Sequence, residues 1–354
     1  MYKEIKKNKL LFVARSWSNR GDNTDFKHFF KFFSGSINIT NPSTIYWDNQ
    51  LYRWIKKQAN QSSYSSLSVA LEMEVCKKAL IYKPKIIHFW FADHDYHYSY
   101  IPAKFTGAKL VGNFFFSIDE LKTRLLVKHH LKKLDLLIAT GEEQKQYLSQ
   151  FISQNKIAIL PLGIDTDFYK PLNHPTERSK QIRLLHVGIN RRDIKTLIKV
   201  FLYLQIKFPT IILEMVGGKS AKYLFKGIKN IKFHSFLSDK ELLKVYQRSS
   251  LLILPLLEGH QSSQSLNEAM AVGLPIVTNN FPNLRNYIFK DYEFISPSEN
   301  VEMMAEHCEK LLLDNDLWME TSRRLRHHSL QFNFTHIKEK LINIYKQYLN
   351  IKIL

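Results

Sequence analysis

The chain has 354 residues, 45% of them hydrophobic, which is enough for two domains of ordinary size that each bury a core. Its two cysteines, Cys76 and Cys308, are far apart and lack a CxxC partner, which excludes a disulfide framework and a zinc-finger pattern and favours a reducing compartment. The formal net charge of +19 is spread along the chain: residues 1–170 hold 25 Lys and Arg against 15 Asp and Glu, and the remainder holds 26 against 17. Such a surface attracts phosphates of nucleic acid, anionic lipid or a nucleotide-linked substrate, although a compositional bias toward lysine would give the same total.

The start of the sequence does not resemble a targeting segment. It is basic, but the apolar run LLFVA behind it is too short for a signal peptide. The longest apolar run, LLILPLL at 251–257, is far shorter than a membrane span. We therefore expect a cytoplasmic protein that is soluble or lies on a membrane surface.

Short, nearly continuous apolar runs alternate with helical patterns along most of the chain, as in parallel sheets covered on both faces. In the first half, strands are expected around 11–14 and at 85–90, 109–116, 134–139 and 156–160, with helices at 66–82, 119–133 and 142–151. In the second half, strands are expected at 183–188, 210–217, 230–235, 251–255 and 274–278, with helices at 192–207, 239–248 and 263–272. From 299 onward the pattern is almost entirely helical.

A polar segment with two prolines, YKPLNHPTERSK at 169–180, separates the two sets of strands and is the best linker candidate. Strand–helix repetition on both sides of it predicts an α/β protein of two doubly wound, Rossmann-like parallel sheets. Ligands of such sheets bind at the carboxyl ends of the strands. Neither half has GxGxxG after its first strand, which argues against a dinucleotide oxidoreductase.

The most informative segment is LLILPLLEGHQSSQSLNEAMAVGLPIVT at 251–278. A strand ends at Pro255, a polar loop follows, and a helix begins near Ser262 or Ser263 and stops at Gly273. The positive end of this helix can hold a diphosphate, and the carboxylate of Glu268, one turn further on, can accept hydrogen bonds from ribose hydroxyls. The amides available to the diphosphate are those of Ser263, Gln264 and Ser265. Taken alone, the same pattern also fits an ordinary strand and serine-capped helix.

This segment resembles the nucleotide-binding signature of the family-4 retaining glycosyltransferases (glycosyl transferases group 1), which have the GT-B fold. The matching residues are Glu258, Gly259, Leu266, Glu268, Ala269, Met270, Ala271, Gly273, Pro275 and Val277. Other stretches that are similar to the family, in the same order, are 160–171, 183–201, 231–255 and 332–345. The resemblance implies an acceptor domain over 1–170 that is completed by a C-terminal helix at 335–354. It implies a donor domain over 171–334.

The resemblance also implies a site for a nucleotide-sugar donor, with no cofactor and no required metal. Arg191 and Arg192 would stabilise the diphosphate, and Glu258 would face the donor sugar. The further donor-binding candidates are Gly188, Phe236, Leu237, His260, Ser262, Ser263, Gln264, Ser265 and Glu268. On the acceptor side, the loop SWSNRGD at 16–22 provides Asn19 and Gly21. A solvated helix start is the alternative interpretation of the two arginines.

Two features depart from the family pattern. Nine residues separate Glu258 from Glu268 where the family has seven, and Phe115 stands near the position of a sugar-contacting histidine. The segment ADHDYHYSY at 92–100 offers His94 or His97 for that contact, and we take His94 as the catalytic candidate. Its clustered Asp and His residues could also be read as metal ligands, but such residues in one loop are more often simply polar.

The segment LKTRLLVKHHLKKL at 121–134 predicts a basic amphipathic helix. It could lie on an anionic membrane, or it could be a solvated face above Leu121, Leu125 and Leu131. The expected activity is transfer of a sugar from a UDP- or GDP-sugar to a glycan, lipid-linked or other envelope acceptor, with retention of configuration. The alternatives are a nucleotide-sugar 2-epimerase of the same fold and a degenerate nucleotide-sugar-binding protein. Nucleic acid is not an expected partner, because the sequence has no recognition motif for it.

Overall fold

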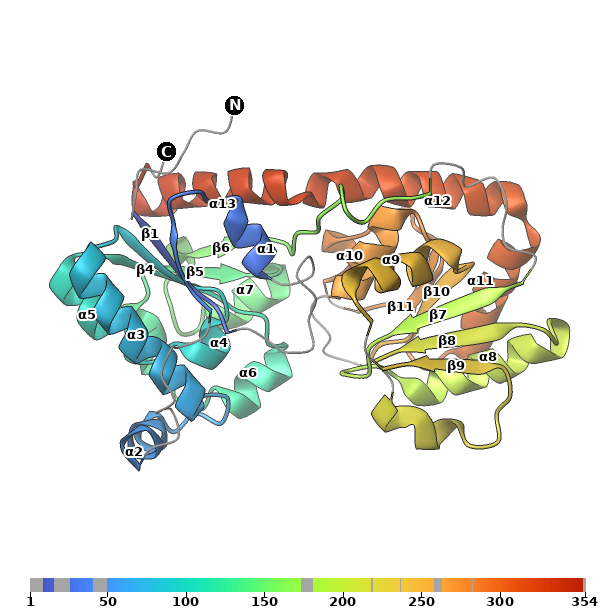
Figure 1. Cartoon of the computed structure of the whole chain (residues 1–354), viewed down its shortest axis with the longest axis horizontal. Coiled ribbons are helices and arrows are strands. Elements are labelled where there is room, and N and C mark those ends of the chain that lie inside the picture. The colour runs from blue at the N-terminus through green and yellow to red at the C-terminus, as the bar shows by residue number, and fades with distance from the viewer. Residues whose placement is uncertain are drawn as a thin grey trace. The chain divides into compact units, whose positions relative to one another are not determined.

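The computed structural model describes residues 9–15, 26–40, 50–172, 181–217, 219–235, 237–257, 263–281 and 283–352. The chain divides into two compact units (Figure 1). The first unit consists of Met1–Pro161 and Phe334–Leu354, and the second consists of Leu162–Asn333.

The first unit is built on a six-stranded parallel sheet in the order β2-β1-β3-β4-β5-β6. Its strands are β1 (Leu10–Val13), β2 (Ile37–Ile39), β3 (Ile86–Phe89), β4 (Lys109–Asn113), β5 (Leu136–Ala139) and β6 (Ile157–Ile159). Its helices are α1 (Phe26–Lys31), α2 (Gln50–Ala59), α3 (Ser66–Tyr82), α4 (Ala92–Asp95), α5 (Tyr100–Thr106), α6 (Ile118–Arg124), η1 (His129–Lys133), α7 (Glu142–Leu148), η2 (Gln154–Lys156) and α13 (Phe334–Leu349).

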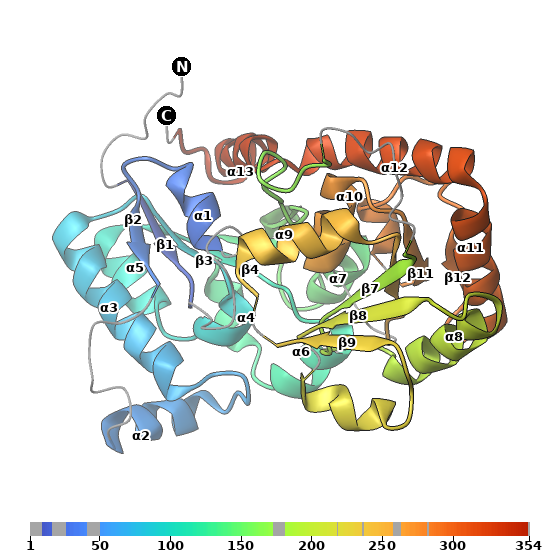
Figure 2. The same ribbon diagram turned by 45° about the vertical axis from the view of Figure 1, so that its right-hand side comes forward.

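Both faces of this sheet are buried. Because side chains alternate along a strand, Leu11 and Val13 face one core, which includes α3 and α5, while Leu10 and Phe12 face a second core. The second core is closed by α1 and by α13, which returns from the end of the chain (Figure 2). The Tyr345 hydroxyl of α13 lies 2.5 Å from Nδ1 of buried His88 in β3. The C-terminal helix is thus part of the first unit.

The second unit has a six-stranded parallel sheet in the order β12-β11-β10-β7-β8-β9. Its strands are β7 (Arg183–Val187), β8 (Ile212–Val216), β9 (Ile231–His234), β10 (Leu251–Leu254), β11 (Ile276–Asn279) and β12 (Ile295–Ser296). Its helices are α8 (Ile194–Lys207), η3 (Lys219–Phe225), α9 (Asp239–Arg248), α10 (Gln264–Val272), η4 (Leu284–Asn286), α11 (Val301–Leu313), α12 (Asn315–Ser329) and η5 (Leu330–Phe332). Two doubly wound parallel sheets confirm the predicted fold class.

The segment from 162 to 170 packs with the second unit, so the observed division lies before Leu162 and not at 170/171. The Arg326 guanidinium of α12 donates hydrogen bonds to the carbonyl oxygens of Thr166, Tyr169 and Ala271, at 3.1, 3.0 and 2.7 Å. Tyr169 is fully buried, and its ring lies 6.3 Å from that of Tyr246. These contacts, which are distant in sequence, hold the segment before and at the start of the predicted linker against helices of the second unit.

The predicted amphipathic helix over 121–134 is wrong. Helix α6 ends at Arg124, and the short 3-10 helix η1 begins only at His129. Leu121, Leu125 and Leu131 are fully buried in the core of the first unit, so they form no exposed apolar face. No helix in the described ranges is long and apolar enough to cross a membrane.

Candidate functional site

The carboxyl edge of the second sheet has a switch point between β7 and β10. From β7 the strand order runs to β8 and β9 on one side, and from β10 to β11 and β12 on the other. The loops that follow these two central strands diverge, and open α/β sheets bind ligands at such a point. Here the two loops are joined by backbone hydrogen bonds, from Asp193 to Pro255 at 3.0 Å and from Leu257 to Arg191 at 3.1 Å.

Two predicted residues shape the loop after β7. Gly188 has φ +85°, and a Cβ atom there would lie 3.7 Å from the Arg192 guanidinium. Arg191 also has a left-handed backbone, with φ 55°, which is uncommon for a residue with a side chain. The carboxylate of Asp193 caps α8 by accepting from the Thr196 amide at 3.0 Å. The loop is thus held in one shape immediately before the positive end of a long helix.

Arg192 connects the loop after β7 with the start of α10. Its Nε donates to the Val187 carbonyl at 3.1 Å, and its Nη2 donates to the hydroxyls of Ser263 and Ser265, both at 3.2 Å. Burial lowers the pKa of Arg192 to about 10, so the guanidinium keeps its charge at neutral pH. A permanent cation therefore stands at the switch point, beside the N-terminus of a helix.

The N-terminus of α10 is more enclosed than the sequence suggested. Ser263 is the N-cap residue, yet its side chain caps no amide; its hydroxyl lies 2.8 Å from that of Ser265. Ser263 and Ser265 are 2% and 4% exposed, and only Gln264 is partly open. A diphosphate at this helix end would therefore replace the two hydroxyls as partner of Arg192.

Glu268 is held inside the second unit by a hydrogen bond from Tyr246. Its carboxylate accepts a hydrogen bond of 2.7 Å from the hydroxyl of Tyr246 on α9, and it is 4% exposed. Burial raises the pKa of Tyr246 well above its usual value, with the negative charge of Glu268 as the next cause, so the phenol remains a donor. The neighbouring Tyr169 hydroxyl is buried and has no hydrogen-bond partner among the described residues. Sequence analysis missed both tyrosines, since each looks like one more aromatic residue on an apolar face.

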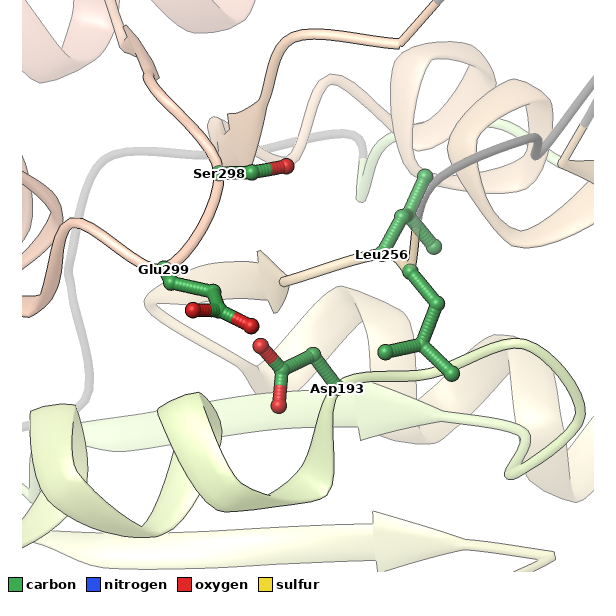
Figure 3. Close-up of a pocket in the computed structure, with 5 residues that line it drawn as sticks. Asp193, Leu256, Ser298 and Glu299 are labelled. Carbon is green, nitrogen blue, oxygen red and sulfur yellow. The ribbon is translucent and has the colours of Figure 1, made fainter.

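A cavity of about 530 Å³ lies beside this network (Figure 3). It is lined by Asp193, Leu256, Leu257, Ser298 and Glu299. The carboxylates of Asp193 and Glu299 point toward one another across it, and none of the described residues that line it is a cation. Two carboxylates accept hydrogen bonds from hydroxyl groups but repel phosphate. The cavity therefore suits a hydroxyl-bearing group, while Arg192 suits the phosphates.

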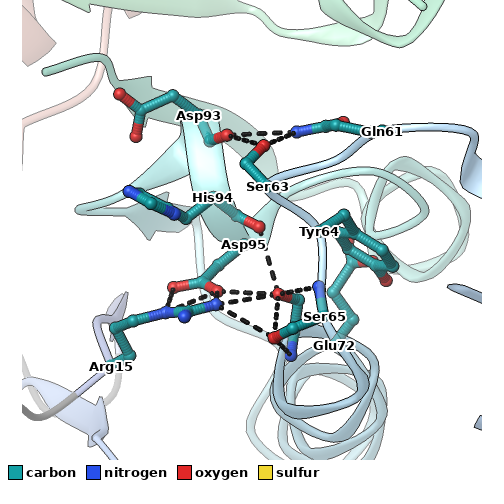
Figure 4. Close-up of polar contacts among 10 residues, drawn as sticks. Arg15, Gln61, Ser63, Tyr64, Ser65, Glu72, Asp93, His94 and Asp95 are labelled. Carbon is teal, nitrogen blue, oxygen red and sulfur yellow. Dashed lines mark hydrogen bonds and ion pairs between the residues drawn. The ribbon is translucent and has the colours of Figure 1, made fainter. Parts of the chain in front are cut away.

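In the first unit, the acidic residues of 92–95 have internal partners (Figure 4). Asp95 forms a buried ion pair with Arg15, and its pKa is raised because burial outweighs that pair. Asp93 accepts hydrogen bonds of 2.7 Å from the amides of Phe115 and Phe116, and burial raises its pKa to about 7. These carboxylates thus brace the chain ends of β1, β3 and β4.

His94 is the partly exposed histidine of this segment. Its ring packs edge-on against Phe116 at 4.4 Å, and burial, with Arg15 and Arg124 nearby, lowers its pKa to about 3. The imidazole is therefore neutral at physiological pH and can either donate or accept a hydrogen bond. His97, in contrast, is buried, with its ring centroid 4.5 Å from that of His130.

Phe115 packs against other aromatic rings, 5.4 Å from Phe91 and 6.3 Å from Trp90. Together with the hydrogen bond from its amide to Asp93, this contact fixes the backbone after β4. An aromatic side chain thus stands near the position where the family resemblance predicts a histidine.

The structure brings Gly188, Arg192, Ser263, Ser265 and Glu268 into one neighbourhood, linked through Tyr246. Leu237 is half-buried and precedes Ser238, which caps α9. The predicted residues outside the described ranges are Asn19, Gly21, Phe236, Glu258, His260 and Ser262. Within those ranges, no three His, Cys, Asp or Glu side chains are arranged to hold a metal ion.

Similar solved structures define the class of fold. A glycosyltransferase from Rickettsia africae aligns over 97% of this chain and 99% of its own, with a TM-score of 0.69 and 17% identity. HepE from Anabaena, in complex with UDP and glucose, aligns over 96% and 99%, with a TM-score of 0.70 and 14% identity. Sucrose-phosphate synthase from Thermosynechococcus elongatus aligns over 96% and 89%, with a TM-score of 0.69 and 16% identity. The protein has the GT-B fold of these glycosyltransferases.

A match to a protein family supports the same class. Residues 170–329, most of the second unit, match the family described as glycosyl transferases group 1. No curated protein matches the sequence.

Proposed function

We propose that the protein is a retaining glycosyltransferase that moves a sugar from a nucleoside diphosphate donor to a glycan, lipid-linked or other envelope acceptor. The observation that carries the proposal is the partly buried cation Arg192 at the switch point, hydrogen-bonded to the first serines of α10. A guanidinium and the positive end of a nine-residue helix together form a site for a diphosphate. The group 1 match covers the whole of this arrangement.

The donor would be bound in three parts. Arg192 would exchange the hydroxyls of Ser263 and Ser265 for phosphate oxygens, with Arg191 as a second cation. Glu268, held by Tyr246, would accept hydrogen bonds from the ribose hydroxyls.

The sugar end of the donor would lie further along the carboxyl edge of the second sheet. The cavity beside Asp193 and Glu299 favours a group rich in hydroxyls over a phosphate. The family resemblance adds Glu258 as a contact to the sugar. The uncharged imidazole of His94 in the first unit is proposed as a further sugar contact in place of the histidine that Phe115 replaces.

In the reaction, the bond between the anomeric carbon and the diphosphate oxygen breaks, and a bond from that carbon to the acceptor oxygen forms on the same face. The acceptor proton passes to the leaving diphosphate, so no protein nucleophile takes part. Catalysis would then come from positioning and from charge stabilisation of the departing diphosphate by Arg192. We place the enzyme in the cytoplasm, with its acceptor at the inner face of the membrane.

UDP-sugars are the first donors to test, because HepE is described in complex with UDP and with UDP-glucose. GDP-sugars remain the second choice. A thermal-shift screen with UDP, GDP, ADP and their sugars should show the largest rise in melting temperature with the true nucleotide, because ligand bound only to the native state stabilises it.

The site assignment is tested by calorimetry on two variants. Arg192→Lys keeps the charge but loses the fork of donors, and should weaken nucleotide diphosphate binding while leaving nucleoside binding nearly unchanged. Glu268→Gln should weaken the diphosphate nucleotide more than its 2′-deoxy form. Lys199→Ala, an exposed residue on α8, is the matched control. Unchanged affinity in both site variants would refute the assignment.

A degenerate, binding-only protein is the second candidate, because Phe115 occupies the place of the sugar-contacting histidine. It predicts tight nucleotide-sugar binding without turnover in the presence of acceptor extracts. The same assay with donor alone, followed by analysis of the sugar, would reveal an isomerised product if the protein were a 2-epimerase.

A further inference from the structure

In the first unit, helix α3 adjoins both α2 and α5 (Figures 1 and 2). A cavity of about 370 Å³ opens among these three helices. Its mouth is formed by Trp54 of α2, Met73 of α3 and Ile101 of α5, which are 60%, 50% and 46% exposed. Phe105, one turn beyond Ile101 on α5, is 81% exposed. Large apolar side chains from three separate helices thus form one patch, which we call the α2–α3–α5 face.

Single exposed apolar residues are common on soluble proteins, but a contiguous patch of them marks a docking surface. Part of this face is built from α2, whose exposed side includes Leu51 as well as Trp54. Tryptophan is the residue most favoured at the boundary between water and lipid, since its ring is apolar and its N–H is polar.

The three helices of this face also carry exposed basic side chains. Neither α2 nor α5 contains an acidic residue. The exposed basic residues are Arg53, Lys56 and Lys57 on α2, Lys77 on α3 and Lys104 on α5. The acidic residue on the outer side of α3 is Glu74, which pairs with Lys78 at 3.7 Å. An apolar patch on helices that also carry exposed basic residues is complementary to a bilayer with anionic headgroups.

A second exposed apolar site, on α8, differs in having carboxylates on the neighbouring helix α11. Ile206 is 81% exposed there, as much as Phe105. Its neighbour Lys207 is paired with Glu309 of α11 at 2.7 Å, and α11 also carries the exposed Glu302 and Glu306. Carboxylates around α8 would be repelled by an anionic surface, so α8 provides a matched control and not a rival docking face.

We propose that the α2–α3–α5 face docks the protein on an anionic lipid bilayer, with Trp54, Ile101 and Phe105 in the interfacial layer and the lysines against the headgroups. The cavity between the helices gives room for apolar groups of the lipid. Docking needs neither donor nor acceptor, so it stands independently of the proposed catalytic function.

Flotation with phosphatidylcholine vesicles, with and without phosphatidylglycerol, tests the proposal on the full chain. Binding should require phosphatidylglycerol and should weaken as the salt concentration is raised, because salt screens the attraction between the lysines and the anionic headgroups. Lys104→Gln should lower the partition coefficient about fivefold, the effect of one basic residue at such a surface. Phe105→Ser should lower it by roughly tenfold or more, as expected for an apolar side chain that leaves the interface.

Ile206→Ser is the matched control, since it removes an equally exposed apolar side chain from α8. It should leave flotation unchanged, and all three variants should keep the wild-type melting temperature. Equal binding to neutral vesicles, equal losses from Phe105→Ser and Ile206→Ser, or no loss from Phe105→Ser would overturn the proposal. So would a dimer in light scattering that Trp54→Ser dissociates, because a second copy would then cover the face. Loss of nucleotide binding with intact flotation would refute the proposed function and leave docking untouched.

Discussion

Asp93 offers a sharp test of the electrostatics of the first unit. Its carboxyl group is fully buried. One oxygen accepts hydrogen bonds from the amides of Phe115 and Phe116, and the other oxygen has no hydrogen-bond partner among the described residues. Burial raises the pKa from the model-compound value of 3.8 to about 7 in the folded protein, and the two amides offset only part of that rise. Between about pH 4 and 7, the unfolded chain is therefore ionised at this residue while the folded protein retains the proton.

The free energy of unfolding should consequently fall as pH rises through this window. Below the pKa of the unfolded state, Asp93 is protonated in both states and no stability is lost. Above about pH 7, it is ionised in both states and the loss of stability is complete. A difference of about three pKa units corresponds to about 4 kcal/mol, at 1.36 kcal/mol per unit. The sign of the effect follows from the raised pKa.

Asp93→Asn keeps the shape and the accepting oxygen but cannot ionise. Near pH 4, we expect the variant to be as stable as wild type or less stable. By pH 8, its free energy of unfolding should have risen relative to that of wild type by up to about 4 kcal/mol. Urea unfolding of both proteins across this range, followed by far-UV circular dichroism, measures the difference. Asp119→Asn, which changes an exposed carboxyl of the same unit, is the control and should show no such gain. A flat difference between wild type and Asp93→Asn from pH 4 to 8 would refute the reasoning.

Three further predictions concern packing and the donor site. Tyr246→Phe removes a hydrogen bond to the carboxylate of Glu268 and should cost about 1.5–3 kcal/mol of stability, measured by denaturation, while also weakening nucleotide binding in calorimetry. Gly112→Ala would place a Cβ atom 2.6 Å from that of Ala92, so a loss of about 1–3 kcal/mol is expected; wild-type stability would show that α4 can shift. Arg326→Ala removes all three hydrogen bonds to backbone carbonyls and should lower the melting temperature, whereas an unchanged value would mean that these bonds contribute little.

The sequence was most informative where local pattern and burial coincide. Apolar runs such as 183–188 and 251–255 became the central strands β7 and β10, because a parallel strand covered on both faces needs an unbroken apolar stretch. The helix at 66–82 also has the predicted bounds, set by the Ser65 capping box and the left-handed Lys83. Short edge strands such as Ile295–Ser296 went unpredicted, because two residues carry no periodicity.

The segment 121–134 shows where pattern alone misleads. Leucines on one side and lysines on the other fit an amphipathic helix, but the chain turns after Arg124 and buries its leucines from two shorter elements. The exposed apolar surface of the first unit comes from α2, α3 and α5 instead. Burial depends on neighbours that are distant in sequence, so the local sequence pattern could not predict which helices carry the exposed apolar surface.

By itself, the sequence determined the two parallel sheets, the position of the helix at 264–272 and the resemblance to group 1 glycosyltransferases, because these depend on residue order and short-range periodicity. Only the tertiary structure decided that Arg192 is hydrogen-bonded to Ser263 and Ser265, and that Tyr246 holds Glu268. These partners are far apart in sequence. Tyr246 precedes Glu268 by 22 residues and precedes Ser265, whose carbonyl also accepts from its hydroxyl, by 19 residues. Arg192 precedes Ser265 by 73 residues. Hydrogen bonds over such separations are fixed by the crossing of strands and helices, which brings side chains together irrespective of their distance in sequence.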